Sequence, residues 1–186
     1  MAEATHRVGA IAAAQRVLYD VGTDVRFDAN NFFETICASA RQTLVRAIVI
    51  DMDAIAPVQL PNDSAMPLAL IMNELLTNAA KHAGTKGATG DRPAHARVAL
   101  AREDDTLVLT VEDDGPGFQL HNVRKRSSGL GLVAGLARQL GGSFDVEPAL
   151  VEPALVEPAL VEPVSKGGAH KGARCVIRFA FRGLAN

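Results

Sequence analysis

The sequence contains no tryptophan and only one tyrosine, and its formal net charge is −2. It therefore lacks the basic footprint and the aromatic platform on which nucleic-acid binding depends, and no nucleic-acid partner is expected. Only two cysteines occur, Cys37 and Cys175, and there is no signal-peptide profile, which favours a reduced cytoplasmic protein over a disulfide scaffold. Charged residues and prolines break every apolar run before it reaches membrane-spanning length, so no direct membrane contact is expected.

A chain of 186 residues, 48% of them hydrophobic, can bury one core and carry a small appendage. The alanine-rich segment from Ala4 to Tyr19 places its apolar residues at helical spacing, and Asp20 to Phe27 interrupts that pattern. The sequence therefore predicts two units: an N-terminal helix within residues 1–27 and one domain over residues 28–186.

Three helices are expected in the larger unit. Asp28 is a candidate N-cap for a helix that runs toward Leu44. A second helix, from about Ser64 to Ala83, carries an apolar stripe on one face and polar residues on another. A third helix is expected from about Gly129 to Leu140.

Five strands are expected between and after these helices. The segments around Val98 and Leu109 are joined by a short acidic turn and predict a β-hairpin. The other strands are predicted from β-branched content at Ala47 to Ala54, near Ser143 to Val146, and at Ala173 to Phe181.

The unit VEPAL occurs three times in succession from Val146 to Leu160, and VEPV follows at Val161 to Val164. A proline every five residues removes backbone donors and argues against a regular α-helix, so an exposed extended or turn-rich loop is expected. The repeats are typical of a tandem insertion into a surface connection, which loop closure tolerates at about 0.6 kcal/mol per doubling of length. Two interpretations stay open: a passive expansion, and a repeat whose copy number tunes activity or stability.

Three short motifs follow one another along the chain: NELLTNAAKHA at Asn73 to Ala83, EDDGPGF at Glu112 to Phe118, and SGLGL at Ser128 to Leu132. Each has an ordinary alternative, as a solvated helix face, a hairpin turn or a plain helix start. Their fixed order favours a common function, which is to hold a nucleotide.

The first motif offers polar groups along one helix. Glu74 and Asn78 are four residues apart and so share a face, with Lys81 and His82 a turn further on. An amide oxygen suits Mg²⁺, which takes its remaining ligands from water and phosphates. A carboxylate beside it can orient or deprotonate a nucleophile.

The second and third motifs bring glycines to a ligand. Gly115 and Gly117 allow close approach of the backbone directly after Asp113, whose carboxylate can accept a hydrogen bond from an exocyclic amine such as that of adenine. Gly129 and Gly131 open a helix whose N-terminal amides favour phosphate.

In this order the motifs resemble the GHKL ATPase superfamily, and more narrowly the catalytic and ATP-binding domain of bacterial sensor histidine kinases, over roughly Asp28 to Arg182. The resemblance implies a Bergerat-type fold, a two-layer α/β sandwich in which three helices cover one face of a mixed, mostly antiparallel sheet. The segment from Gln119 to Ser128 would be a short ATP lid. A short lid and the lack of a separate phenylalanine box are similar to HWE-like and related kinases.

The resemblance also implies ATP and Mg²⁺ as ligands and gives roles to individual residues. Glu74 would be the general base and Asn78 the Mg²⁺ ligand. The remaining nucleotide contacts would be Lys81, His82, Asp113, Gly115, Gly117, Gly129, Leu130, Gly131 and Leu132. One departure is Ala173 after Gly172, where many relatives have threonine.

A complete kinase of this kind carries its phosphoacceptor histidine on a two-helix dimerisation hairpin ahead of the ATP domain. The helix within residues 1–27 resembles the second helix of such a hairpin, as a remnant that would pair with its copy in a homodimer. His6 is only a weak candidate for the acceptor, and a solvated N-terminal histidine is the alternative.

Three functions follow from these observations. The first is Mg²⁺-dependent transfer of the ATP γ-phosphoryl to a histidine, with a phosphoacceptor domain and a response regulator as partners. The second is a protein serine kinase of the anti-sigma type. The third is a non-catalytic scaffold that binds nucleotide or relays phosphate.

Overall fold

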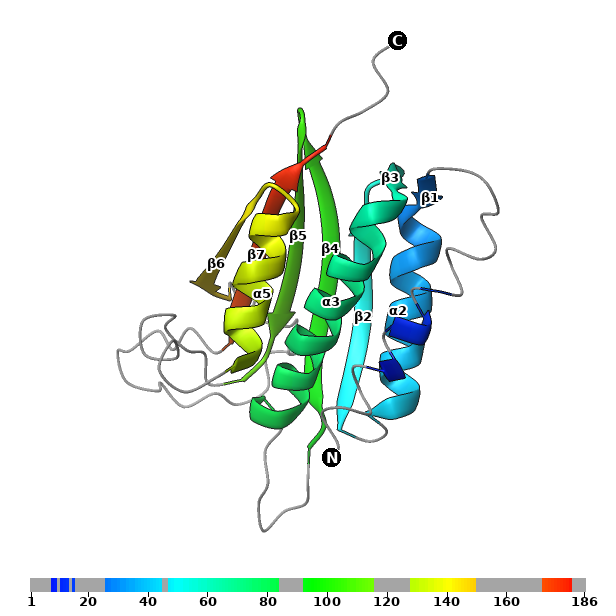
Figure 1. Cartoon of the computed structure of the whole chain (residues 1–186). Coiled ribbons are helices and arrows are strands. Elements are labelled where there is room, and N and C mark those ends of the chain that lie inside the picture. Colours follow the sequence, from blue (N-terminus) through cyan, green and yellow to red (C-terminus); the bar gives the residue numbers. More distant parts are fainter. Residues whose placement is uncertain are drawn as a thin grey trace, which may run out of the picture.

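The computed structural model describes residues 8–9, 11–13, 15, 26–44, 47–83, 92–115, 128–149 and 172–181. A five-stranded sheet with the order β2-β4-β5-β7-β6 forms one layer (Figure 1). Strand β2 pairs in parallel with β4, and the other neighbours pair antiparallel. The expected mixed, mostly antiparallel sheet is therefore confirmed. Its strands are Ile48–Ile55 (β2), Ala94–Glu103 (β4), Thr106–Asp113 (β5), Ser143–Pro148 (β6) and Ala173–Ala180 (β7).

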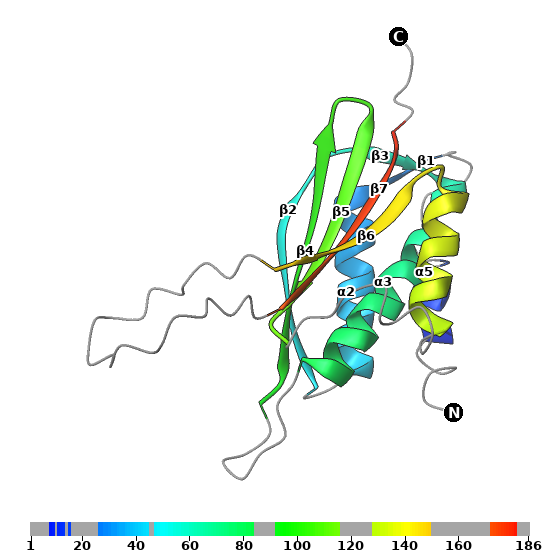
Figure 2. The same ribbon diagram turned by 90° about the vertical axis from the view of Figure 1, so that its left-hand side faces the viewer.

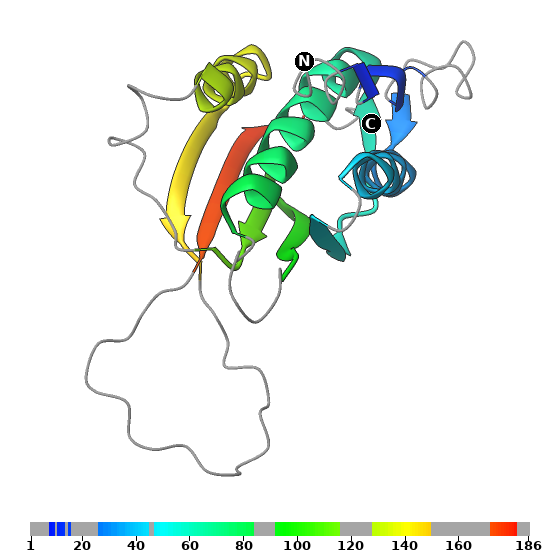
Figure 3. The same cartoon turned by 90° about the horizontal axis from the view of Figure 1, so that it is seen from below.

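Three helices form the second layer, and all lie on the same face of the sheet (Figures 2 and 3). They are α2 (Ala29–Thr43), α3 (Asn62–His82) and α5 (Ser128–Gln139). Helix α3 lies between the other two (Figure 3). This arrangement is the expected two-layer α/β sandwich.

The core lies between the two layers. The predicted apolar stripe of α3 is buried against the sheet, because its members recur at the spacing of one helix face: Leu68, Ile71, Met72, Leu75 and Ala79. Alternate residues of the strands face them, among them Val98, Leu109 and Ile177, each with 0% exposure. The amphipathic patterns therefore position α3, whose polar end forms the site described below.

Asp28 caps α2 as the sequence predicts, because its Oδ1 accepts a hydrogen bond of 2.8 Å from the backbone N of Asn31. Asp28 also ends a short strand, β1 (Arg26–Asp28), which pairs antiparallel with β3 (Gln59–Pro61). Neither strand is predicted from the sequence. Each has three residues, which is too short for an alternating pattern to be recognised.

The predicted hairpin is present, with Glu103 opposite Thr106 and Asp104 at the turn with a φ of 52°. Strand β6 pairs with β7 up to Pro148 opposite Ala173, so the first three residues of the first VEPAL unit are strand and not the predicted loop. Proline is tolerated there because β6 is an edge strand. The repeats beyond Ala149 lie outside the described residues, and so their predicted loop conformation stays a prediction.

The described positions of the N-terminal unit are helical at residues 8–9, 11–13 and 15. Ala13 is fully buried and belongs to the same core as the sheet and helices. Gly9 lies against α2, since a Cβ there would be 3.9 Å from the side-chain oxygens of Ser39 and Thr43. His6 lies outside the described residues, and pairing with a second copy stays a prediction. No helix in the described ranges combines the length and apolarity that a membrane crossing requires.

Candidate functional site

The polar face of α3 forms one wall of the site. Glu74 is buried, with 8% exposure, although it is a carboxylate, whereas Asn78 is half-buried one turn further along. Lys81 and His82 are exposed in the last turn of the helix. These four predicted residues thus lie along the last turns of α3, and their exposure increases from the buried Glu74 to the exposed Lys81 and His82.

Asp113 ends β5 and faces this wall. Its Oδ1 accepts hydrogen bonds from the backbone N of Gly115 at 2.9 Å and of Ala173 at 3.4 Å. Its Oδ2 accepts no hydrogen bond from any described residue. Burial raises the pKa of Asp113 from 3.8, while the two backbone N–H groups and the nearby His82 act in the opposite direction.

Gly115 joins the two walls. A Cβ at this position would be 2.9 Å from the Cα of Ala83, directly after α3. Only glycine therefore lets the turn after Asp113 approach the end of α3 this closely. Gly117, the second glycine of the same motif, lies outside the described residues, as does the predicted lid up to residue 127.

The third motif begins α5. Gly129 and Gly131 lie in its first turn, and Gly131 is exposed with open space around it. Leu130 is buried with 8% exposure, and Leu132 packs against the core. Gly131 thus leaves open space in the first turn of α5, while the leucines pack toward the core.

Four residues that help to build the site were not predicted as site residues. Gly172 has a φ of 135°, and a Cβ there would be 2.2 Å from the backbone O of Asp113. Ala173, noted only as a departure from the family, donates to Asp113 through its backbone, which a side-chain motif does not reveal. Arg92 and Asp114 form an ion pair of 2.6 Å beside the turn.

The donor set suits Mg²⁺ in one respect. Asn78 offers an amide oxygen and Glu74 a carboxylate on adjacent turns, and this ion commonly takes one or two protein oxygens together with substrate phosphates. Within the described ranges, no group of three histidine, cysteine, aspartate or glutamate side chains forms a metal cluster.

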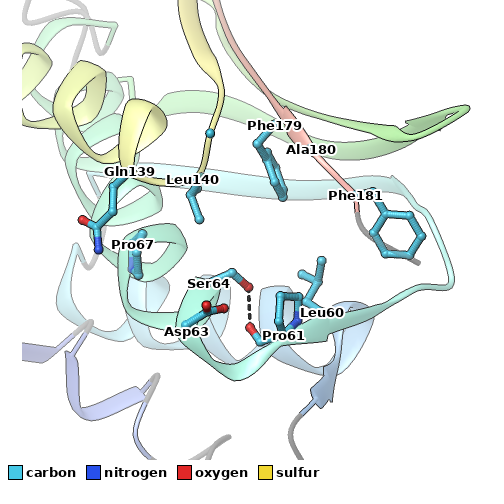
Figure 4. Close-up of a pocket in the computed structure, with 11 residues that line it drawn as sticks. Leu60, Pro61, Asp63, Ser64, Pro67, Gln139, Leu140, Phe179, Ala180 and Phe181 are labelled. Atoms are coloured by element: carbon cyan, nitrogen blue, oxygen red, sulfur yellow. Dashed lines mark hydrogen bonds between the residues drawn. The ribbon is translucent and has the colours of Figure 1, made fainter. Parts of the chain in front are cut away.

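A separate pocket of about 420 Å³ lies between the starts of α3 and the ends of α5 and β7 (Figure 4). Phe179 and Phe181 contribute to its mostly apolar lining, and Ser64 Oγ donates to the backbone O of Pro61 at 2.6 Å. None of the predicted site residues lines this pocket. It lies at the opposite end of α3 from Asn78.

A two-layer sandwich in which a half-buried carboxylate at a glycine turn meets the polar end of a helix defines an ATPase domain of the GHKL class. The family model described as histidine kinase-, DNA gyrase B- and HSP90-like ATPase matches residues 63–182, and the chain belongs to this family. Among curated proteins, the comparison finds no match.

Solved histidine kinase structures share the fold. The histidine kinase domain of the Erythrobacter litoralis EL346 blue-light activated histidine kinase aligns with a TM-score of 0.69 at 20% identity, covering 96% of this chain and 75% of that one. The mycobacterial sensor histidine kinase MprB gives 0.61 at 20% identity, over 86% and 98% of the two chains. The ATP-binding domain of PrrB from Mycobacterium tuberculosis gives 0.59 at 19% identity, over 86% and 100%. At these identities the likeness establishes the fold, and the HWE-like subtype stays a prediction.

Proposed function

We propose that this chain is the catalytic, ATP-binding domain of a two-component sensor histidine kinase, which transfers the γ-phosphoryl group of ATP to a histidine with Mg²⁺ bound. The observation that carries the proposal is the carboxylate of Asp113, whose Oδ1 is fixed by two backbone N–H groups, while no residue that the structure describes donates to its Oδ2. Such a fixed acceptor suits the exocyclic amine of adenine, which a purine with a carbonyl at that position lacks.

The residues around Asp113 then take complementary roles. Asn78 would hold Mg²⁺, which neutralises phosphate charge when bound. Lys81 and His82 would contact phosphates from the end of α3, and the first turn of α5, with Gly129 and Gly131, would face them with its N-terminal end.

The chemical step moves one phosphoryl group and one proton. An imidazole nitrogen of the acceptor histidine attacks the γ-phosphorus, and the bond to the β,γ-bridging oxygen breaks, so that ADP leaves with the bonding electrons. Glu74 accepts the proton that the imidazole loses. The acceptor belongs to a phosphoacceptor domain, and a response regulator takes the group onward. ATP as substrate and two free cysteines favour a cytoplasmic location for this activity.

The first test is calorimetric titration of the whole chain with a non-hydrolysable ATP analogue, with and without Mg²⁺. Saturable binding is expected, lost in Asp113→Ala and weakened in Asn78→Ala only when Mg²⁺ is present. Asp145→Ala is a matched control, because it removes an exposed carboxylate of β6 that lies outside the site. Absence of binding by the folded wild-type chain would refute the proposal.

The acceptor is tested separately, by incubating the chain and radiolabelled ATP with isolated phosphoacceptor domains. A phosphoryl group on histidine is released by acid and survives base, whereas phosphoserine survives acid. An acid-stable product on a partner protein would instead identify the serine kinase of the anti-sigma type.

A further inference from the structure

The ladder between β4 and β5 ends at the residue that anchors the nucleotide base in the proposed function. Asp113 lies opposite Ala96 in the last pair of this ladder. The turn that follows has left the sheet, yet it must hold the Asp113 carboxylate in a fixed direction. Some other interaction therefore has to fix the turn.

Asp114 supplies that interaction. Its backbone N donates to the backbone O of His95 at 3.1 Å, and its Oδ1 accepts from the backbone N of His95 at 2.9 Å. The two bonds together continue the sheet by one step, with a side chain in place of the second strand's carbonyl. They hold the turn to the beginning of β4.

Arg92 completes the arrangement from the other side. Its Nη1 donates to Oδ2 of Asp114 at 2.6 Å, so both oxygens of this carboxylate have a partner. Because Arg92 lies just before β4, the ion pair holds the turn to the start of that strand. Gly115 links the turn to α3, through its contact with Ala83.

We infer that Asp114 and Arg92 are positioning residues for adenine recognition, which act through Asp113 and do not touch the nucleotide themselves. The inference rests on the proposed function, because it assumes that Asp113 accepts a hydrogen bond from the base. Asp114 contributes most, since its loss leaves the backbone N of His95 without its partner. Arg92 contributes less, because its side chain is 53% exposed and exposed ion pairs are weak.

The inference predicts different effects on the binding of two nucleotides that differ at the base. ADP carries the exocyclic amine, whereas IDP carries a carbonyl at the same position and so lacks the exocyclic donor that Asp113 would accept from. Loosening the turn should therefore weaken ADP binding and leave IDP binding nearly unchanged. A general loss of structure would weaken both nucleotides alike.

The experiment is calorimetric titration of ADP and IDP, with Mg²⁺, into the whole chain and its variants. Asp114→Ala is expected to raise the Kd for ADP about tenfold, and Arg92→Gln about threefold, with the Kd for IDP changed less than about twofold in each. Arg92→Lys should restore much of the ADP affinity, because it keeps the charge. Arg178→Gln is the matched control, because this arginine also pairs with carboxylates, Asp145 and Glu147 of β6, and makes no contact with Asp114.

Equal loss of ADP and IDP affinity in Arg92→Gln, or unchanged ADP affinity in both Arg92→Gln and a folded Asp114→Ala, would overturn the inference. Arg92→Gln keeps the test valid where Asp114→Ala does not fold, as judged by thermal unfolding. Failure of the wild-type chain to bind either nucleotide would instead refute the proposed function, so the two failures are distinguishable.

Discussion

Asp113 is a partly buried carboxylate, and its burial bears both on the stability of the protein and on the proposed binding of a ligand. Its burial raises the pKa, so the folded protein binds the proton more tightly than the unfolded chain does. The contribution of this one group to stability is then fully present below the ordinary pKa of 3.8 and is lost as pH rises through the raised pKa, since the charged form is desolvated only in the folded state. A ligand that donates a hydrogen bond to this carboxylate would stabilise its charged form.

Asp113→Asn is therefore expected to raise the melting temperature at pH 7, because the amide oxygen keeps the bonds from Gly115 and Ala173 without a charge. The gain should shrink as pH falls toward 3.8. Thermal unfolding followed between pH 3.5 and pH 8 measures it, and a gain that grows in acid would contradict the explanation. ADP binding should weaken at least about tenfold in the same variant, because the amide places an NH2 donor where Oδ2 stood, and a donor cannot accept a hydrogen bond from the adenine amine.

Glu74 differs from Asp113 in the step that it serves. As the proposed general base it is needed for transfer and not for nucleotide binding, so Glu74→Gln should lower the rate of phosphoryl transfer about 10²-fold or more. The Kd for the ATP analogue should change less than about twofold. Rates of phosphohistidine formation and calorimetry on the same preparation give both values, with Asp145→Asn as control. A rate within about threefold of wild type would exclude this role.

Among the elements, α2 depends on one residue that serves both a strand and a helix. Asp28 caps α2 through Asn31, and its Oδ2 accepts from Gln59 Nε2 on β3 at 3.3 Å. Because both contacts lie outside the nucleotide site, Asp28→Ala should lower stability by about 1 kcal/mol and leave the Kd for ADP unchanged. Urea unfolding measures the loss. Asp28→Asn, which keeps the capping oxygen, should retain most of the stability, and an equal loss in both variants would mean that the charge matters instead.

Long elements could be predicted from the sequence because their patterns are local. The apolar stripe of α3 repeats over several turns, and the hairpin strands lie next to each other in the chain on either side of an acidic turn. Strands β1 and β3 could not be predicted in this way, since three residues give no period and their pairing joins distant segments.

The same distinction holds for the site. Glu74, Asn78 and Asp113 belong to motifs that can be recognised in one stretch of sequence. The bonds from Ala173 to Asp113 and from Arg92 to Asp114 join residues that are 60 and 22 positions apart, and the first uses only the backbone. No local sequence pattern indicates such contacts, so they can be identified only in the folded structure.

Over the whole molecule, the solvent face of the sheet is held by a series of ion pairs across its last strands. Arg174 contacts Glu112 at 3.2 Å and Glu147 at 3.9 Å, while Arg178 lies 3.6 Å from Asp145 and from Glu147. Each exposed pair contributes little alone. Together they link β5, β7 and β6, so the edge strand β6 keeps its register although the VEPAL repeats follow it directly.

The ends of the repeat connection lie beside the nucleotide site. The backbone N of Ala149 donates to the O of Gly172 at 3.3 Å, and the next residue, Ala173, donates to Asp113 at 3.4 Å. These are long hydrogen bonds, at the open end of the β6–β7 ladder. Any increase in the free energy needed to close the connection acts first on these two bonds.

The number of VEPAL units should therefore have a small effect on the melting temperature and on ADP affinity, and added units should lower both. The connection between Pro148 and Ala173 has 24 residues, and removal of two VEPAL units leaves 14. Loop closure then becomes easier by about 0.5 kcal/mol, which corresponds to about 1–2 °C in melting temperature and at most about a twofold lower Kd for ADP. A fourth unit should act in the opposite direction. Replacing two units by glycine and serine at constant length separates the effect of length from that of sequence. If only length matters, this replacement should leave the melting temperature and the Kd for ADP unchanged. Equal melting temperature and equal ATP turnover in the one-unit and three-unit forms would show that the repeats are a passive expansion.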